Sequence, residues 1–145
     1  MAKLKTYPKV TIYGDVVSKS NQYRIIKIGG HASLKKTDAV KRFEEGFFLQ
    51  NSLRNVFIEG FFELYVDVYF SSNRKDLDGA FKLLLDALQA DRTIKNDRQC
   101  VKIVANKFVD KVKPRIEFTI VEVGVVEERN TKQLSLFDEE ESGEG

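Results

Sequence analysis

The stretch Val66–Asp97, VDVYFSSNRKDLDGAFKLLLDALQADRTIKND, predicts a strand, a helix and the approach to a second strand in one continuous run. It opens with apolar residues at every second position, which is the period of a strand, and then breaks at Ser71-Ser72-Asn73. Four apolar residues then recur at the spacing of one helix face: Phe81, Leu84, Leu85 and Leu88. We expect the rest of the chain to be built around this unit.

Three aspartates and one lysine stand at the ends of the unit. Asp76 and Asp78 come just before the predicted helix and in its first turn, and Asp97 follows the helix at the start of the next strand. Lys82 falls away from the apolar stripe. Carboxylate oxygens suit Mg²⁺ or Mn²⁺ rather than zinc. The four residues together therefore predict a divalent-metal site.

Each of these residues also has an ordinary structural explanation. An aspartate before or within the first helical turn can cap the helix or favour its dipole, as Asp76 and Asp78 would. Asp97 can be a turn residue. Lys82 and Asp86 are four residues apart and can form a surface ion pair worth about 0.3–0.5 kcal/mol. Taken singly these explanations are the better ones, and only the combination favours a site.

The flanking sequence adds strands and one further helix. The expected strands are Lys9–Val17, Tyr23–Ile28, Phe61–Phe70, Gln99–Phe108 and Arg115–Val123. Gly29-Gly30 end the second strand, and His31–Lys36 lead into a helix that is capped by Thr37 and ends before Asn55. This order predicts an α+β fold in which a mixed or antiparallel sheet of about five strands is covered by two helices.

Composition predicts one soluble domain followed by a tail. The chain has 145 residues, 42% of them apolar, and a single cysteine, which fits a reducing compartment. It has no secretion signal and no membrane-spanning run, so we expect a cytoplasmic protein. Residues 127–145 carry seven acidic and two basic residues, or −5, which leaves +7 on residues 1–126. We expect 1–126 to fold, with a basic surface typical of polyanion binding, and 127–145 to be a disordered acidic tail.

The spacing D-x-D-x₃-K-x₃-D-x-L followed by N-D resembles that of the RusA family of Holliday junction resolvases. The matching residues are Asp76, Asp78, Lys82, Asp86, Leu88 and Asp97. Similarity extends to Ser20–Arg24, to His31-Ala32-Ser33 and to Arg115–Val123, so that it covers about residues 7–124. The chain departs from the family at Gly79, where Asn is usual, and at Asn96, where the family usually has an aspartate.

The resemblance implies a homodimeric, metal-dependent endodeoxyribonuclease that resolves four-way junctions by paired nicks in recombination and repair. Asp76, Asp78 and Asp97 would be the catalytic carboxylates and would hold Mg²⁺, for which Mn²⁺ can substitute, while Lys82 would be a catalytic cation. Candidate DNA contacts are the basic residues Lys19, Arg24, Lys27, Lys35, Lys36, Arg74, Lys75 and Arg98. The alternative is a catalytically silent DNA-binding or adaptor protein, which the departures at Gly79 and Asn96 keep open.

The tail contains one apolar pentapeptide, Gln133-Leu134-Ser135-Leu136-Phe137. QLSLF resembles the motif by which bacterial replication and repair proteins bind the β sliding clamp, with the glutamine making polar contacts and Leu134, Leu136 and Phe137 as the apolar residues. The alternative is a chance apolar segment in a polar tail. A clamp partner would place the protein in the cytoplasm of a bacterium or of a phage-infected cell.

Overall fold

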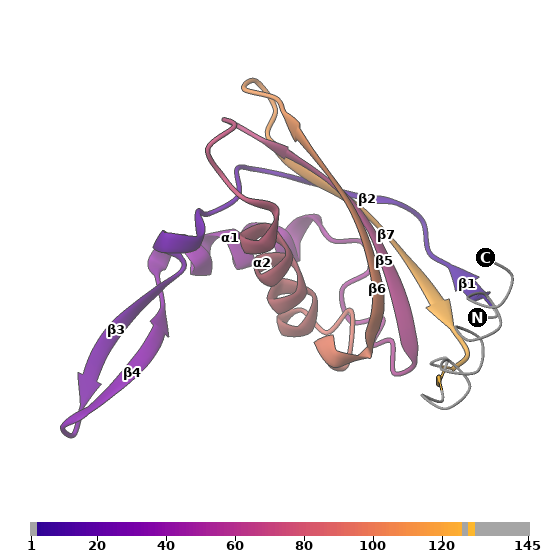
Figure 1. The fold of residues 1–145 in the computed structure, drawn as a ribbon, viewed down its shortest axis with the longest axis horizontal. Coiled ribbons are helices and arrows are strands. Elements are labelled where there is room, and N and C mark those ends of the chain that lie inside the picture. The colour runs from indigo at the N-terminus through magenta and orange to yellow at the C-terminus, as the bar shows by residue number, and fades with distance from the viewer. Residues whose placement is uncertain (1–2, 126–127, 130–145) are drawn as a thin grey trace, which may run out of the picture.

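The structure is a computed structural model that describes residues 3–125 and 128–129 (Figure 1). Its elements follow in chain order: β1 (Lys3–Thr6), β2 (Val10–Tyr13), the 3-10 helix η1 (Lys19–Asn21), β3 (Tyr23–Ile28), β4 (His31–Lys36), α1 (Asp38–Gln50), β5 (Phe61–Phe70), α2 (Leu77–Ala90), the 3-10 helix η2 (Asp97–Gln99), β6 (Cys100–Val109) and β7 (Arg115–Val123).

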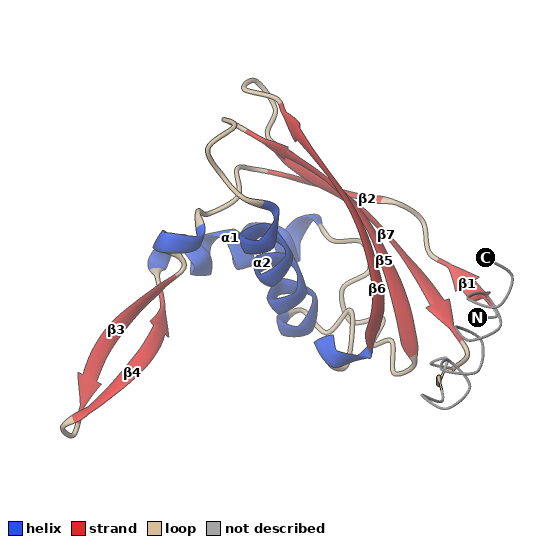
Figure 2. Cartoon of the chain, viewed as in Figure 1, coloured by secondary structure: helices blue, strands red, loops and turns tan. Residues whose placement is uncertain are grey.

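One mixed sheet and two helices form the body of the protein. The sheet has the order β1-β7-β5-β6, and β2 also pairs with β7. Strands β5 and β6 are parallel, whereas β7 is antiparallel to β1, β2 and β5. Both α-helices lie on the same side of this sheet (Figures 1 and 2). The predicted α+β class, with a five-stranded mixed sheet covered by two helices, is confirmed.

The core lies between the helices and the sheet. The residues of β5 predicted to share one face are buried, as are the alternate residues of β7: Leu64, Val66, Val68, Phe70, Ile116, Phe118 and Ile120. Phe47 of α1 stacks on Phe118 with ring centroids 5.9 Å apart. In α2 the predicted Leu84 and Leu88 are buried, but Phe81 and Leu85 are only partly so, because the buried face is shifted toward Ala80, Leu83 and Ala87.

The N-terminal third differs from the sequence prediction in three ways. The strand expected at Lys9–Val17 ends at Tyr13, because Gly14 turns the chain with φ of +130°. Strand β1, with four exposed residues, was not predicted. The expectation that His31–Lys36 lead directly into a helix was wrong, since these residues form β4. Helix α1 then begins as predicted, with the backbone N–H of Val40 donating to Thr37 Oγ1 at 3.4 Å.

Strands β3 and β4 make an antiparallel hairpin that is separate from the main sheet. Gly29 and Gly30 have φ of +57° and +83°, and Ile28 pairs with His31, as in a two-residue type I′ turn. The hairpin projects from the body on the side of the helices (Figure 1).

Among the described residues, no helix combines the length and the apolar character needed to cross a membrane. The pentapeptide at residues 133–137 and most of the predicted tail lie outside the described residues.

Candidate active site

The first two predicted acids stand at the N-terminus of α2. Asp76 is the N-cap residue in the positional sense, with extended backbone angles of −105° and 148°, but its side chain accepts no capping hydrogen bond. Asp78 lies in the first turn, and both side chains are exposed. The capping explanation thus fails for the Asp76 carboxylate, which is open to solvent at the positive end of the helix dipole.

Asp78 is paired with a cation from the segment before the hairpin. Lys19 Nζ donates to Asp78 Oδ2 at 2.7 Å, with both side chains more than half exposed. This hydrogen bond, with that from the backbone N–H of Gly79, lowers the pKa of Asp78, and the same contact raises the pKa of Lys19. The acid is therefore held ionised by a partner that solvent, metal or phosphate can displace.

Asp15, which the sequence did not single out, anchors the loop that carries Asp76. Asp15 Oδ2 accepts from Lys75 Nζ at 2.8 Å and from the hydroxyl of Ser71, and Lys75 Nζ also donates to the carbonyl of Val16 at 2.6 Å. Lys75, a predicted DNA contact, thus has its ammonium engaged within the protein, whereas Arg74 is exposed. The signal for Asp15 in the sequence is an aspartate inside an apolar run that predicts a strand.

Gly79 has a packing reason to lack a side chain. Gln22 is 2% exposed, and its Nε2 donates to the carbonyls of Val17 and Gly79 at 3.0 and 3.1 Å. A Cβ at position 79 would lie 3.2 Å from Lys19 Cβ. The glycine therefore lets η1 lie close against the first turn of α2, where Lys19 meets Asp78.

Lys82 lies one turn further along α2, beside a polar pocket of about 340 Å³. Its Nζ is 3.9 Å from Asp86 Oδ2 and 5.4 Å from the ring centroid of Tyr23. Asp86 Oδ2 also accepts from the hydroxyl of Tyr23 at 2.9 Å, and burial together with this bond raises the pKa of Tyr23 to about 12. The predicted Lys82–Asp86 ion pair is present, but the distance between its charged atoms is long and the lysine side chain is exposed.

Asp97 begins η2 and is exposed. Its backbone N–H donates to Gln89 Oε1 at 3.0 Å, which places Asp97 at the C-terminal end of α2. Asn96 caps η2, since its Oδ1 accepts from the backbone N–H of Arg98 at 3.0 Å, while its own N–H donates to Gln99 Oε1. The asparagine at this departure from the family pattern therefore serves the local turn.

The structure does not bring all three predicted metal ligands together in one chain. From Asp78 to Gln89 the helix rises by about 16 Å, so Asp97 lies far from the other two acids. The cause is the parallel pairing of β5 with β6, which returns the chain to the opposite end of the helix before Cys100 pairs with Phe62. Within the described part of the chain, no group of three or more His, Cys, Asp or Glu side chains could hold a metal ion.

A buried polar network fixes the segment that leads to Asp97. Asn51 Nδ2 donates to Asp91 Oδ2 at 2.7 Å and to Thr93 Oγ1 at 2.8 Å, and the Thr93 hydroxyl donates to Asp91 Oδ1 at 2.7 Å. All three residues are at most 5% exposed. The network joins the end of α1 to the end of α2, and nothing in the local sequence pattern predicted it.

The other predicted DNA contacts divide into paired and free cations. Lys36 Nζ lies 2.8 Å from Glu44 Oε1. Over the described residues, the side chains of Arg24, Lys27 and Lys35 on the hairpin form no hydrogen bond or ion pair, and all three are exposed. Arg98 is exposed beside Asp97.

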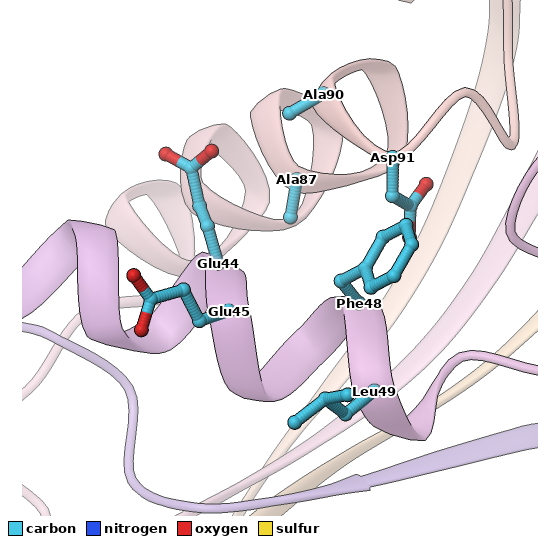
Figure 3. Close-up of a pocket in the computed structure, with 7 residues that line it drawn as sticks. All are labelled: Glu44, Glu45, Phe48, Leu49, Ala87, Ala90 and Asp91. Carbon is cyan, nitrogen blue, oxygen red and sulfur yellow. The ribbon is translucent and has the colours of Figure 1, made fainter.

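A second pocket, of about 500 Å³, lies between α1 and α2 (Figure 3). It contains none of the predicted site residues and is lined by Glu44, Glu45, Phe48, Leu49, Ala87, Ala90 and Asp91. Its walls are mainly apolar, so the chemistry of the predicted site does not extend into it.

Comparison with known proteins matches residues 16–121 to the family described as Endodeoxyribonuclease RusA. No match to a curated protein was found. The matched range spans most of the chain and includes all the predicted catalytic residues.

Proposed function

The chain belongs to the RusA family of endodeoxyribonucleases, which resolve Holliday junctions by cutting DNA phosphodiester bonds, and we propose that it does so with Mg²⁺ in recombination and repair. The observation that carries the proposal is the pair of solvent-open carboxylates, Asp76 and Asp78, at the positive end of α2 with Lys82 one turn away. Hard oxygen ligands at a helix N-terminus on an endonuclease chain suit Mg²⁺, with Mn²⁺ as a substitute.

All three predicted ligands can meet at one divalent ion only if two chains contribute to the site. Asp76 and Asp78 supply two carboxylates from one end of α2, while Asp97 of the same chain is about 16 Å away along the helix. In a C₂ homodimer, residues at opposite ends of two antiparallel α2 helices can meet. We propose that Asp97 of the partner subunit completes each site, which makes dimerisation a condition for activity.

When bound, the metal would act as a Lewis acid and activate water for attack at phosphorus. The chain's own cations have separate tasks. Lys19, which now neutralises Asp78, would be released by the metal and would be free to contact a phosphate. Lys82 is exposed and loosely held by Asp86, so its ammonium can reach a phosphate oxygen and stabilise the charge that develops there.

The nicking of a synthetic four-way junction tests this proposal. In Mg²⁺ the protein should cut the junction and leave a linear duplex of the same sequence intact, and Asp78→Asn should abolish cutting while junction binding persists. Binding without cutting by the wild-type protein would favour the alternative of a catalytically silent DNA-binding or adaptor protein.

A second proposal concerns a partner of the tail. We propose that Gln133, Leu134, Leu136 and Phe137 dock on a bacterial β sliding clamp, which would raise the concentration of the nuclease at replication forks without changing its chemistry. The support is the sequence QLSLF alone, surrounded by polar residues.

A peptide spanning residues 131–140 should bind a purified β clamp with a Kd of about micromolar size, or roughly −8 kcal/mol. In the full-length protein, Leu136→Ala with Phe137→Ala should abolish clamp binding but leave junction cutting in solution unchanged. Ser135→Ala is the matched control, because it lies within the motif but is not one of the contact residues. Failure of the intact protein to bind the clamp would reduce the pentapeptide to a chance segment.

A further inference from the structure

Strand β6, at the edge of the sheet, exposes apolar side chains on both of its faces. On the face covered by the helices, Ile103 and Val109 are 38% and 46% exposed, although their neighbours on β5 are fully buried. On the other face, Val104 and Phe108 are 40% and 42% exposed. In the part of the chain that the structure describes, β6 pairs with β5 alone, so its outer edge carries unpaired backbone groups along ten residues. A long edge of this kind is a template for pairing with another strand.

One flank of α2 continues this surface. Four residues at intervals of three, four and four positions share one stripe along the helix, namely Asp78, Phe81, Leu85 and Gln89. The stripe faces away from α1, because Ala87, which lines the pocket between the two helices, is on the opposite flank. Helix α1 contacts β2 and helix α2 contacts β6, so the stripe lies on the side of the β6 edge. Its two apolar members, Phe81 and Leu85, are only half-buried.

The stripe has residues of the predicted site at both ends. Asp78 is at its N-terminal end, and at its C-terminal end Gln89 Oε1 accepts from the backbone N–H of Asp97 at 3.0 Å. A second stripe packed antiparallel to the first would place Asp78 beside the partner's Gln89 and Asp97, with Phe81 against the partner's Leu85 between them. A parallel arrangement would instead place Asp78 beside its own copy and leave the acids as far apart as they are in one chain.

Antiparallel pairing of β6 with its copy leads to the same arrangement. Cys100 begins β6 three residues after Asp97, and the strand ends at Val109, which pairs with Phe70 at the end of β5. Antiparallel pairing sets the start of one β6 against the end of the other. It therefore brings Asp97 toward the partner's loop that leads from Phe70 to Asp76. One two-fold axis satisfies both the strand and the helix.

The charges of β6 allow it to pair with a copy of itself. The charged residues of the strand are Lys102 and Lys107. Because five positions separate them, their side chains point to opposite faces of the sheet. A two-fold axis perpendicular to the sheet keeps the helices of both copies on one side, so side chains from matching faces meet. A pairing centred in the strand therefore sets neither lysine opposite another lysine.

From these observations we propose that two copies of the chain join along the α2–β6 edge. Strand β6 pairs antiparallel with its copy in one continuous sheet, and the stripes of the two α2 helices pack antiparallel over it. The interface sets Asp76 and Asp78 of each subunit toward Asp97 of the partner subunit. This inference rests on the proposed function, since it takes the three acids as one site.

The first test is the oligomeric state of the full-length protein by light scattering, without DNA or metal. The variant Ile103→Lys/Val109→Lys changes side chains that are already partly exposed, so its fold should persist, which circular dichroism checks. It should be a monomer at concentrations at which the wild type is a dimer, because the interface would bury the new charges. Leu49→Lys/Val56→Lys adds the same charge at exposed apolar residues away from this edge and should stay dimeric.

Cross-linking then tests the orientation of the helices. In a background that carries Cys100→Ser, Phe81→Cys protein is mixed with Leu85→Cys protein, and the mixture is oxidised after subunit exchange. Disulfide-linked dimers should form in the mixture and hardly at all in either protein alone, because residue 81 faces residue 85 of the partner subunit and a disulfide needs Cα atoms within about 7 Å. Parallel helices would give linked dimers in each protein alone.

A dimer that survives Ile103→Lys/Val109→Lys would overturn the inference, as would a monomeric wild type. Linked dimers in the single proteins but not in the mixture would overturn the antiparallel arrangement. Nicking of a four-way junction in Mg²⁺ by the wild type separates this failure from that of the proposed function. If the wild type cuts while the lysine variant stays dimeric, only the interface is lost. If the lysine variant is monomeric but the wild type does not cut, only the proposed function is lost.

Discussion

Lys82 is a residue at which catalytic and structural roles predict opposite results. Its pairing with Asp86 at 3.9 Å is exposed and worth at most about 0.5 kcal/mol, whereas loss of an electrostatic catalyst costs about 10²-fold in rate. We expect Lys82→Ala to slow single-turnover junction cutting by about 10²-fold or more. Its melting temperature should fall by no more than about 2 °C. Lys95→Ala, at another exposed lysine, is the control. Normal cutting with a clearly lower melting temperature would assign Lys82 a structural role.

Glu117 gives the fold a defined acid sensitivity. Its carboxylate accepts hydrogen bonds from Lys9 Nζ at 2.7 Å and from Arg115 Nε at 2.8 Å. These contacts lower the pKa of Glu117 from 4.5, and the contact with Lys9 has the larger effect. Because the folded pKa is the lower one, the stabilisation is complete above about pH 4.5 and is lost as the pH falls through the folded pKa. We expect Glu117→Gln to reduce the melting temperature at pH 7, and this deficit should shrink as the pH falls below about 4.5. An equal deficit for Glu117→Gln at pH 7 and at low pH would contradict the assignment.

At this scale the sequence predicted the individual acids but not their neighbours. Asp76 and Asp78 could be found from their spacing and from the helix that follows them, both of which are local features. The contact of Lys19 with Asp78 joins residues 59 positions apart, and the packing that requires a glycine at 79 comes from the same approach. Such contacts form between residues that are distant in the sequence. They leave no local periodicity or spacing from which a single sequence could predict them.

At the scale of elements, prediction succeeded where periodicity was strong and failed where strands were short or exposed. Strands β3, β5 and β7 have the predicted bounds: β5 and β7 alternate apolar and polar residues over most of their length, and β3 lies between turn residues on both sides. Strand β4 has six residues, and the first five are exposed. Its sequence therefore lacks the alternation of apolar and polar residues that marks a half-buried strand. Gly29-Gly30 between two such runs is nevertheless a hairpin signal, and the prediction that these glycines merely end a strand was incomplete.

The network of Asn51, Asp91 and Thr93 is expected to hold α1, α2 and the approach to Asp97 as one unit. Removing one member of a buried network leaves its partners unsatisfied, which costs about 1–3 kcal/mol for each group. We expect Asn51→Ala to lower the free energy of unfolding by about 2–4 kcal/mol in urea titrations. Ser52→Ala, one residue further on and exposed, is the control. Unchanged stability of Asn51→Ala would show that water replaces the missing hydrogen bonds.

At the scale of the whole molecule, the sequence left open whether the strands that flank α2 are parallel or antiparallel. That choice decides where Asp97 lies. A parallel partner strand must start at the end of the sheet where β5 starts, so the connecting helix carries the chain away from Asp76 and Asp78 before Asp97 is reached. The residue list of the site therefore stays a prediction from the sequence, and nothing in the sequence indicated that Asp97 and the other two acids lie at opposite ends of a helix.

Because Asp97 lies at the opposite end of α2 from Asp76 and Asp78, an experiment can distinguish a site shared between two subunits from a site within one chain. Asp76→Asn/Asp78→Asn and Asp97→Asn should each be inactive as homodimers. In a mixed dimer with shared sites, one site receives both defects and the other receives none, because Asp76 and Asp78 come from one subunit and Asp97 from the other. After subunit exchange in an equal mixture, about half of the dimers are mixed, and about one quarter of all sites should be intact.

The measurement is nicking of a four-way junction before and after exchange, with dimer formation followed by light scattering. Cutting should appear only after exchange and should be mostly single nicks, because each mixed dimer has one working site. The matched control mixes Asp76→Asn with Asp78→Asn, whose defects lie on the same end of α2. That mixture should stay inactive, since every site then lacks one of the two carboxylates. Absence of any regained cutting in the first mixture, with mixed dimers present, would place all three acids in one chain and would require a conformation in which Asp97 moves toward the start of α2.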